Sequence, residues 1–345
     1  MNKKIPALFT LIAVLVTAVF SGCSWDKEDN GKISIVTTSF PPYDFARAVA
    51  GDKADITMLL STGAEAHSYE PTPLDIAKIQ KCDVFVCIGG EDEVWVDKIL
   101  DAIDTSDIKV IRLFDYAELL EEEEVEGASP NGHDHHHHEH EEHHHEHEEH
   151  HHDDEDDDEH EHHDEDVDDF EADGHIWTSP ENAIRCVEGV KDELCEKYPE
   201  DKDFFTKNGD DYVNRLEELD EQFSEMTENA PENVIVIGDR FPFRYLSHEY
   251  GLEYFAAFSG CSSESEPSVY TMAFLMDEIK EHDLDTVFYL EFSTKKLAEK
   301  LCSATGAKML PLYSCHNVTK KDFEDGVTYI DLMKTNLENL REALY

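Results

Sequence analysis

Short apolar runs alternate along this chain with segments whose apolar residues recur at the spacing of a helix. In the first third, runs rich in β-branched and apolar residues predict buried strands at 33–38, 55–60, 83–88 and 109–113. Between them, apolar positions at helical spacing predict helices at 43–49, from about 74, and at 93–103. Because strands that alternate with helices form βαβ units, the pattern predicts a parallel sheet.

The last third of the chain repeats this alternation. Strands are expected at 233–238, 253–257, 286–290 and 308–312, and helices at 242–250, 269–281, 294–305 and 329–343. Two polar helices, 181–197 and 202–228, come before this unit, and the second carries an apolar stripe. So long a helical stretch between two α/β units indicates a rigid connector. The predicted fold class is therefore α/β, with two parallel-sheet lobes joined by a long rigid helix and a ligand cleft between the lobes.

The first residues of the chain have the pattern of an export signal. Two lysines precede an apolar run at 7–20, which is short for a transmembrane helix, and small residues follow it. Residues 19–23 resemble a bacterial lipobox, which implies cleavage before Cys23 and a lipid on its sulfur. Ordinary secretory cleavage is the alternative. We therefore expect a signal peptide at 1–22 and a lipid-anchored tether at 23–32.

A segment made almost entirely of histidine and acid lies between the two α/β units. Residues 133–163 hold 16 of the chain's 21 histidines, and almost no apolar residue accompanies them. A segment of this composition cannot bury a core, so we expect a disordered insert at 121–173. Imidazole and carboxylate are ligands that Zn²⁺ accepts, which favours an auxiliary metal-binding tract over a solvated acidic linker. Its candidate ligands include His133, His135, His136, His137, His138, His140, His143, His144 and His145.

The charge of the chain excludes one large class of function. The net charge is −53, and 27 of the 81 acidic residues lie in 121–173, a stretch without lysine or arginine. No cluster of lysine and arginine appears elsewhere, so the chain is not expected to bind nucleic acid. Seven cysteines follow Cys23, an odd number that leaves at least one thiol unpaired within the chain. None of them forms a CxxC pair, so a closed structural zinc site is not indicated.

Five histidines lie outside the tract: His67, His175, His248, His282 and His316. His67 and His175 stand in loops beside prolines, and His316 follows the last predicted strand. Loops at strand ends on a rigid scaffold are where binding groups collect, so these three predict a common site. His248 lies inside a predicted polar helix and His282 follows one, so both are expected at the surface.

Several segments, in order along the chain, resemble the zinc- and manganese-binding lipoproteins of ABC importers. They are GAEAHSYEPTP at 63–73, GGEDEVW at 89–95, GHIWTSP at 174–180 and YIDLMKTNLENL at 329–340, with the His/acid-rich insert between the second and third. The resemblance covers about residues 33–343. It implies two lobes joined by one long helix, with a metal held in the cleft by side chains of both lobes. The domains expected from it are an N-terminal lobe at 33–180, connecting helices at 181–230 and a C-terminal lobe at 231–345.

The resemblance also implies ligands, residue by residue. His67 and His175 fall on the two N-lobe histidine ligands of the family. Where the family has a C-lobe histidine or glutamate, this chain has Gly-Asp239-Arg, so Asp239 is either a ligand or the ion-pair partner of Arg240 or Arg244. Where the family has an aspartate after the last strand, this chain has Cys-His. The candidate metal ligands are therefore His67, His175, His316 and Asp239, with Glu291 and Cys315 as further donors.

Such a ligand set favours zinc. Imidazoles with one carboxylate suit four-coordinate Zn²⁺, whereas Mn²⁺ prefers more oxygen ligands. We expect a monomeric, lipid-anchored protein at the extracytoplasmic face of a bacterial membrane, which captures Zn²⁺ and delivers it to an ABC permease with its ATPase. No catalysis is required. The alternatives are a carrier of manganese or another divalent metal, and an extracellular metal store or adhesin. A zinc hydrolase is disfavoured, because GxSxG does not occur and HExxH occurs only within the His/acid-rich tract, where no helix is expected to present it.

Overall fold

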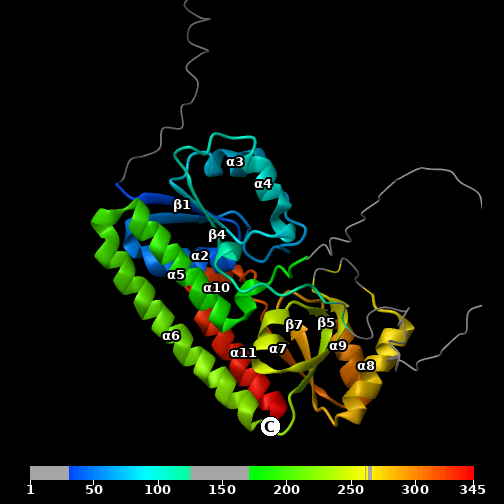
Figure 1. Ribbon diagram of the computed structural model, residues 1–345. Coiled ribbons are helices and arrows are strands. Elements are labelled where there is room, and N and C mark those ends of the chain that lie inside the picture. The colour runs from blue at the N-terminus through cyan, green and yellow to red at the C-terminus, as the bar shows by residue number, and fades with distance from the viewer. Residues whose placement is uncertain (1–30, 124, 126–170, 261, 263–265) are drawn as a thin grey trace, which may run out of the picture.

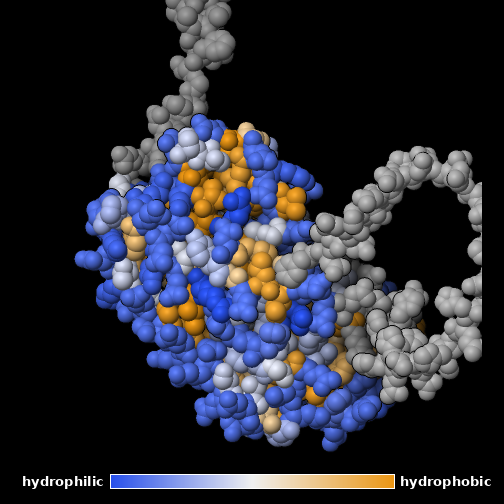
Figure 2. Space-filling view, in the orientation of Figure 1, coloured by the Kyte–Doolittle hydropathy of each residue, from blue (hydrophilic) through white to orange (hydrophobic). Residues whose placement is uncertain are grey.

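The computed structural model of the chain describes residues 31–123, 125, 171–260, 262 and 266–345. The predicted signal peptide, the predicted lipidation site Cys23 and the histidines of the tract lie outside the described residues. Of the helices in the described part of the chain, none is long and apolar enough to cross a membrane. The face of the molecule drawn in Figure 2 is mostly hydrophilic, as its net charge of −53 leads one to expect.

The N-terminal lobe is built on the parallel sheet that the apolar runs predicted. Its strands are β1 (Ile33–Thr37), β2 (Ala54–Met58), β3 (Val84–Cys87) and β4 (Lys109–Arg112), in the order β2-β1-β3-β4. All three neighbouring pairs are parallel. β3 is buried along its whole length, which is typical of a strand covered on both faces.

Three helices belong to this lobe: α2 (Phe40–Ala50), α3 (Pro73–Ile79) and α4 (Val94–Leu100). α2 begins before the predicted residue 43, because prolines are tolerated in the first turn of a helix, where backbone N–H groups have no partner within the helix. At the start of α3, Thr72 and Asp75 cap each other's backbone N–H groups. This cap ends the loop that carries His67.

Two long helices connect the lobes, as the sequence predicted. α5 covers Pro180–Lys197, and α6 covers Lys202–Asn229. The 28 residues of α6 span roughly 42 Å at the usual rise of an α-helix. α6 packs against α2 of the N-lobe at one end and against the C-terminal helix α11 (Tyr329–Leu344) at the other, so it braces both lobes (Figure 1).

The C-terminal lobe repeats the topology of the first. Its strands are β5 (Val234–Phe241), β6 (Glu253–Ser259), β7 (Thr286–Leu290) and β8 (Lys308–Leu312), in the order β6-β5-β7-β8. Its remaining helices are α7 (Arg244–Tyr250), α8 (Val269–Glu281), α9 (Lys296–Thr305) and the short α10 (Lys320–Glu324), which the pattern did not predict. The predicted α/β fold with two parallel sheets is confirmed.

β5 differs from its prediction in a way that matters for the site. The strand was expected to end at residue 238, but it continues to Phe241 with a shift of register between Ile237 and Arg240. Asp239 and Arg240 therefore lie within the strand and not in a loop after it. The extension was not readable from the sequence, because these two charged residues interrupt the apolar run that marked the strand.

One hydrophobic core joins the two lobes. It contains Phe45 of α2, Phe223 of α6 and Tyr329 of α11, all of them almost completely buried. Two smaller clusters lie apart from it, one between the N-lobe sheet, α3 and α4, and one between the C-lobe sheet, α8 and α9. The shared core fixes the lobes relative to each other and so holds the loops between them in place.

The backbone segments at the two ends of the predicted insert form hydrogen bonds with each other. Glu121 forms an antiparallel bridge with Ala172, and the N–H of Asp173 donates to the carbonyl oxygen of Leu120 at 2.9 Å. Asp173 was predicted to belong to a disordered segment, but it is 4% exposed. Its carboxylate is buried because it pairs with His175, so the folded lobe resumes earlier than composition suggested.

Candidate metal centre

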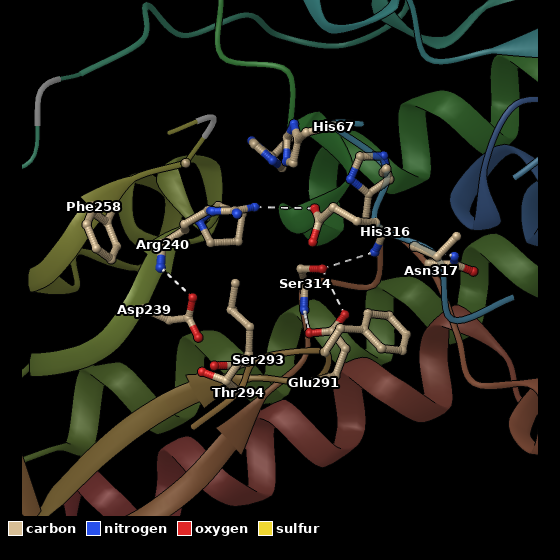
Figure 3. Close-up of a pocket in the computed structure, with 18 of the residues that line it drawn as sticks. His67, Asp239, Arg240, Phe258, Glu291, Ser293, Thr294, Ser314, His316 and Asn317 are labelled. Atoms are coloured by element: carbon tan, nitrogen blue, oxygen red, sulfur yellow. Dashed lines mark hydrogen bonds and ion pairs between the residues drawn. The ribbon is translucent and has the colours of Figure 1, made fainter. Parts of the chain in front are cut away.

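Three histidines from distant parts of the chain meet where the two lobes face each other. His67 stands between β2 and α3, His175 precedes α5, and His316 follows β8. One ring nitrogen of each lies within 4.8 Å of those of the other two. Figure 3 shows His67 and His316 on the same side of the pocket. The structure thus brings together the three histidines that strand-end position had singled out.

His175 is held in a fixed orientation by Asp173. Its Nδ1 lies 3.1 Å from Oδ1 of Asp173, and the same oxygen accepts the backbone N–H of His175 at 2.8 Å. A carboxylate can only accept, so Nδ1 carries the proton and Nε2 keeps its lone pair. Nε2 is buried and has no hydrogen-bond partner, an arrangement that costs free energy unless something binds there. Burial lowers the pKa of His175, but the charge and hydrogen bond of Asp173 outweigh burial and raise it.

His316 is kept neutral by its surroundings. Burial, followed by the nearby rings of His67 and His175, holds the pKa of His316 well below its ordinary value. The ring packs against the indole of Trp177, with 4.6 Å between centroids. Neutral imidazole is the form that binds metals, so this environment favours ligation.

His67 comes from a more open loop. Its Nδ1 lies 3.8 Å from Oδ1 of Asp92, and its side chain is 21% exposed. Asp92 in turn lies against Gly174, where an added Cβ would approach Oδ2 of Asp92 to 1.9 Å. Gly174 is therefore the residue that lets the Asp92 carboxylate reach this position.

The loop that carries His316 is docked on the N-lobe, although it belongs to the C-lobe in sequence. The side-chain amide of Asn317 donates to the carbonyl oxygens of Ser61 and Ala64, both at 2.9 Å. The N–H of Gly63 donates to the carbonyl oxygen of Val318 at 2.9 Å, and the N–H of Phe40 donates to that of His316 at 3.3 Å. The three imidazoles therefore form one preassembled set.

Asp239 lies in the pocket but outside this set. It is not part of the group formed by the three histidines, and its Oδ1 accepts the backbone N–H of Arg240 at 2.9 Å. The ion pairs considered for Asp239 are made by other acids: Arg240 pairs with Glu65 at 3.3 Å, and Arg244 pairs with Glu123 at 2.8 Å.

Glu291 and Cys315, the two further donors, also stand outside the histidine group. Glu291 accepts the N–H of Ser314 at 2.9 Å and its hydroxyl at 2.8 Å, so it supports the loop before His316. Burial raises the pKa of Glu291 to about 7. Cys315 is buried with its Sγ directed at the carbonyl oxygen of Tyr313, and burial raises the pKa of the thiol well above its ordinary value. A thiol that keeps its proton is a poor zinc ligand.

A cavity of about 290 Å³ opens beside the histidines. The three imidazoles form one part of its lining, and Asp239, Arg240, Glu291, Ser293 and Thr294 of the C-lobe form another (Figure 3). Two carboxylates that support the histidines were missed from the sequence. Asp173 could have been found two positions before His175, whereas nothing in the sequence joins Asp92 to His67.

A protein with two parallel α/β lobes and a set of imidazoles between them has the architecture of a solute-binding protein for metal ions. Residues 35–343 match the model of the family described as zinc-uptake complex component A, periplasmic. The chain belongs to this family, which confirms the resemblance drawn from the motifs.

Two bacterial zinc proteins with similar sequences agree with this family assignment. The chain is 33% identical over 334 residues to the zinc-binding lipoprotein AdcA of Streptococcus pneumoniae. The matched region covers 96% of this chain and 60% of AdcA. It is 30% identical over 340 residues to the high-affinity zinc uptake system protein ZnuA of Bacillus subtilis, covering 99% of this chain and 96% of the relative. The chain thus spans about 60% of the length of AdcA and nearly all of ZnuA.

The fold is also that of relatives with solved structures, one of them zinc-bound. The crystal structure of the Zn(II)-bound ZnuA-like domain of Streptococcus pneumoniae AdcA superposes with a TM-score of 0.69 at 31% identity, over 91% of this chain and 99% of that domain. The metal-dependent lipoprotein YcdH of Bacillus subtilis superposes with a TM-score of 0.70 at 27% identity, over 91% of this chain and 99% of YcdH.

Proposed function

We propose that this protein captures Zn²⁺ outside the cytoplasmic membrane and delivers it to an ABC permease for import. The observation that carries the proposal is the meeting of three imidazoles, in which one ring nitrogen of His175 lies within 4.8 Å of ring nitrogens of His67 and His316, while the buried Nε2 of His175 has no hydrogen-bond partner. A metal bound by the three imidazoles would satisfy this atom. Binding and release need no catalytic group, so the protein acts as a carrier and not as an enzyme.

Zinc is the cargo that this ligand set favours. Three imidazoles are typical of zinc sites, whereas Mn²⁺ prefers sites richer in oxygen ligands. Asp173 supports His175 through the other ring nitrogen, an arrangement common around bound zinc. The names of the AdcA and ZnuA relatives, which are zinc proteins, support the same choice.

The N-terminal sequence pattern and the lipoprotein relatives support a location at the outer face of the cytoplasmic membrane. A lipid on Cys23 would tether the protein to the outer face of the membrane, beside the permease and its ATPase. The histidines at 133–163 would collect zinc near the cleft by raising its local concentration. In this scheme the tract feeds the site, and the monomeric two-lobed body holds the ion that is handed over.

Zinc titration of the full chain tests the proposal. The wild-type protein is expected to bind one Zn²⁺ tightly, in competition with a chelator, besides weaker binding to the tract. His175→Ala should abolish the tight site. His282→Ala is the control, because His282 pairs with Glu232 at the surface and lies outside the cavity. Tight binding that persists in His175→Ala would refute the assignment.

A further inference from the structure

The proposed zinc site has three protein ligands and one side that faces open space. Zn²⁺ in proteins is bound almost always by four ligands. Among the described residues, the group of mutually close ligand atoms at this site contains the three imidazoles and no carboxylate. The fourth ligand must therefore come from a residue that moves or from solution.

The cavity on that side has room for more than water. Its volume is about 290 Å³, whereas a water molecule takes up about 30 Å³ in the liquid. Arg240 of β5 lines the C-lobe side of the cavity, together with Ser293 and Thr294, which follow β7 (Figure 3). A guanidinium and hydroxyl groups are donors that suit an oxyanion.

Arg240 is the one lysine or arginine among the described residues that line this cavity. Its side chain is 26% exposed, and its guanidinium makes a single described hydrogen bond, to Glu65 at 3.3 Å. A guanidinium carries five N–H donors in a planar fork that matches the two oxygens of a carboxylate. Most of these donors therefore stay available to a ligand in the cavity.

The two acidic side chains of the C-lobe wall, Asp239 and Glu291, accept hydrogen bonds from neighbouring residues. Asp239 accepts the backbone N–H of Arg240, and both oxygens of Glu291 accept hydrogen bonds from Ser314. Gly260, which also lines the cavity, packs closely against the His175 loop, because a Cβ there would come within 2.9 Å of the carbonyl oxygen of Phe241 and 3.2 Å of Cε1 of His175. An incoming anion thus meets the metal on one side and Arg240 on the other.

We propose that the cleft binds Zn²⁺ together with a small carboxylate anion. One carboxylate oxygen completes the coordination of the metal, and the other accepts hydrogen bonds from Arg240. The inference rests on the proposed function and specifies the form in which the cargo is held. The carboxylate either binds free from solution or arrives on the metal as part of a chelate.

Cobalt substitution in the full chain tests this inference, because the visible d–d bands of Co²⁺ report its ligands. The protein is loaded with less than one equivalent of Co²⁺, and the cleft bands are those that His175→Ala removes. Acetate is then titrated at an ionic strength held constant with perchlorate. We expect a saturable change of the cleft bands, and roughly tenfold weaker acetate binding in Arg240→Gln because a charge-assisted hydrogen bond is lost.

Arg112→Gln is the matched control. Arg112 pairs with Asp97 on the surface and lies outside the cavity, so acetate should bind this variant as it binds the wild type. A parallel titration with citrate, which chelates metals, distinguishes the two sources. A response to citrate alone that depends on Arg240 supports arrival as a chelate, whereas a response to acetate supports a free anion.

Three results would overturn the inference. Cleft bands that respond to neither anion, or that respond equally in Arg240→Gln, would leave water as the fourth ligand. Cleft bands that shift in Glu65→Gln without any added anion would assign the fourth position to Glu65. Co²⁺ bands unchanged by His175→Ala would contradict the zinc site itself and the inference with it.

Discussion

The indole Nε1–H of Trp177 donates a hydrogen bond to the carbonyl oxygen of Ser314 at 2.8 Å, and so links the loop of His175 to the loop of His316. The indole also packs against both imidazoles, with centroid distances of 5.4 Å to His175 and 4.6 Å to His316. Tyr329 secures Trp177 from α11, because its hydroxyl donates to the Trp177 carbonyl oxygen at 2.6 Å. One side chain thus sets the separation of ligands that come from the two lobes.

Trp177→Phe should weaken zinc binding while the fold persists. The variant keeps an aromatic ring in the core but loses the hydrogen bond to Ser314, so the His316 loop is less firmly held. We expect roughly tenfold lower zinc affinity, since losses of about this size follow removal of groups that orient metal ligands. Tyr345→Phe, which removes a hydrogen bond to Met226 far from the site, is the control. Equal affinities in both variants would contradict the role given to Trp177.

The tight zinc affinity should fall as the solution becomes acidic, and His175 should set where the fall begins. The pKa of His175 is raised, because Asp173 outweighs the lowering by burial, so protons compete with zinc for this ring at a higher pH than usual. The pKa of His316 is held low, so that ring stays neutral over the same range. Zinc affinities measured by chelator competition from neutral to mildly acidic pH check this.

Asp173→Asn tests two effects of the Asp173 carboxylate, which raises the pKa of His175 and orients its imidazole ring. The pKa of His175 should drop, so proton competition begins at a lower pH than in the wild type. At neutral pH the zinc affinity should fall by about 10–100-fold, because His175 loses the partner that orients it. A pH profile identical to that of the wild type would show that Asp173 does not control His175.

Gly174→Ala should destabilise the protein, because residue 174 lies against Asp92 next to the site. The added methyl group would meet Oδ2 of Asp92 at 1.9 Å, so the carboxylate or the backbone must move. We expect a loss of about 1–3 kcal/mol in the free energy of unfolding, as is usual for overpacking, together with weaker zinc binding. Urea unfolding and zinc titration measure the two effects.

Gly209→Ala provides the comparison for Gly174→Ala. Gly209 lies within α6, and its new methyl group would meet the stem of the Lys191 side chain, at 2.7 Å from Cδ and 3.2 Å from Cβ, so this side chain must shift. Alanine also favours a helix over glycine by about 1 kcal/mol. This variant should therefore lose less free energy of unfolding than Gly174→Ala, because the helix preference offsets part of the cost of moving Lys191. Equal losses of unfolding free energy in both variants would contradict the importance given to the contact between Gly174 and Asp92.

Deletion of residues 133–163 distinguishes a carrier from a metal store. In the proposed carrier, the single tight zinc site survives and only the weaker binding falls. If the tract itself is the store, tight binding disappears with it. A variant that keeps the length of the tract but replaces its histidines by asparagine should behave like the deletion, since imidazole is the group that binds.

Local pattern was sufficient for most of the fold. The apolar runs at Ile33 and Val84 mark buried strands because parallel strands are covered on both faces, and this is visible within a few residues. The same reasoning located α5 and α6 almost to the residue. It was wrong about the end of β5, where Asp239 and Arg240 continue the strand through pairing with β6, a contact that the local pattern does not record.

For the candidate site, too, the sequence identified the residues, whereas the tertiary structure determined how they come together. Residue type and strand-end position were enough to single out His67, His175 and His316, since imidazole nitrogens can bind metals and binding groups collect in loops at strand ends. Their convergence was decided by the tertiary structure, above all by Asn317, which ties the C-lobe loop to Ser61 and Ala64 of the N-lobe. The tertiary structure likewise separates Cys315 from the three imidazoles, because its buried Sγ faces the carbonyl oxygen of Tyr313 and is not part of the histidine group. Hydrogen bonds and desolvation between residues hundreds of positions apart have no signature in a linear sequence, so only the folded chain could settle them.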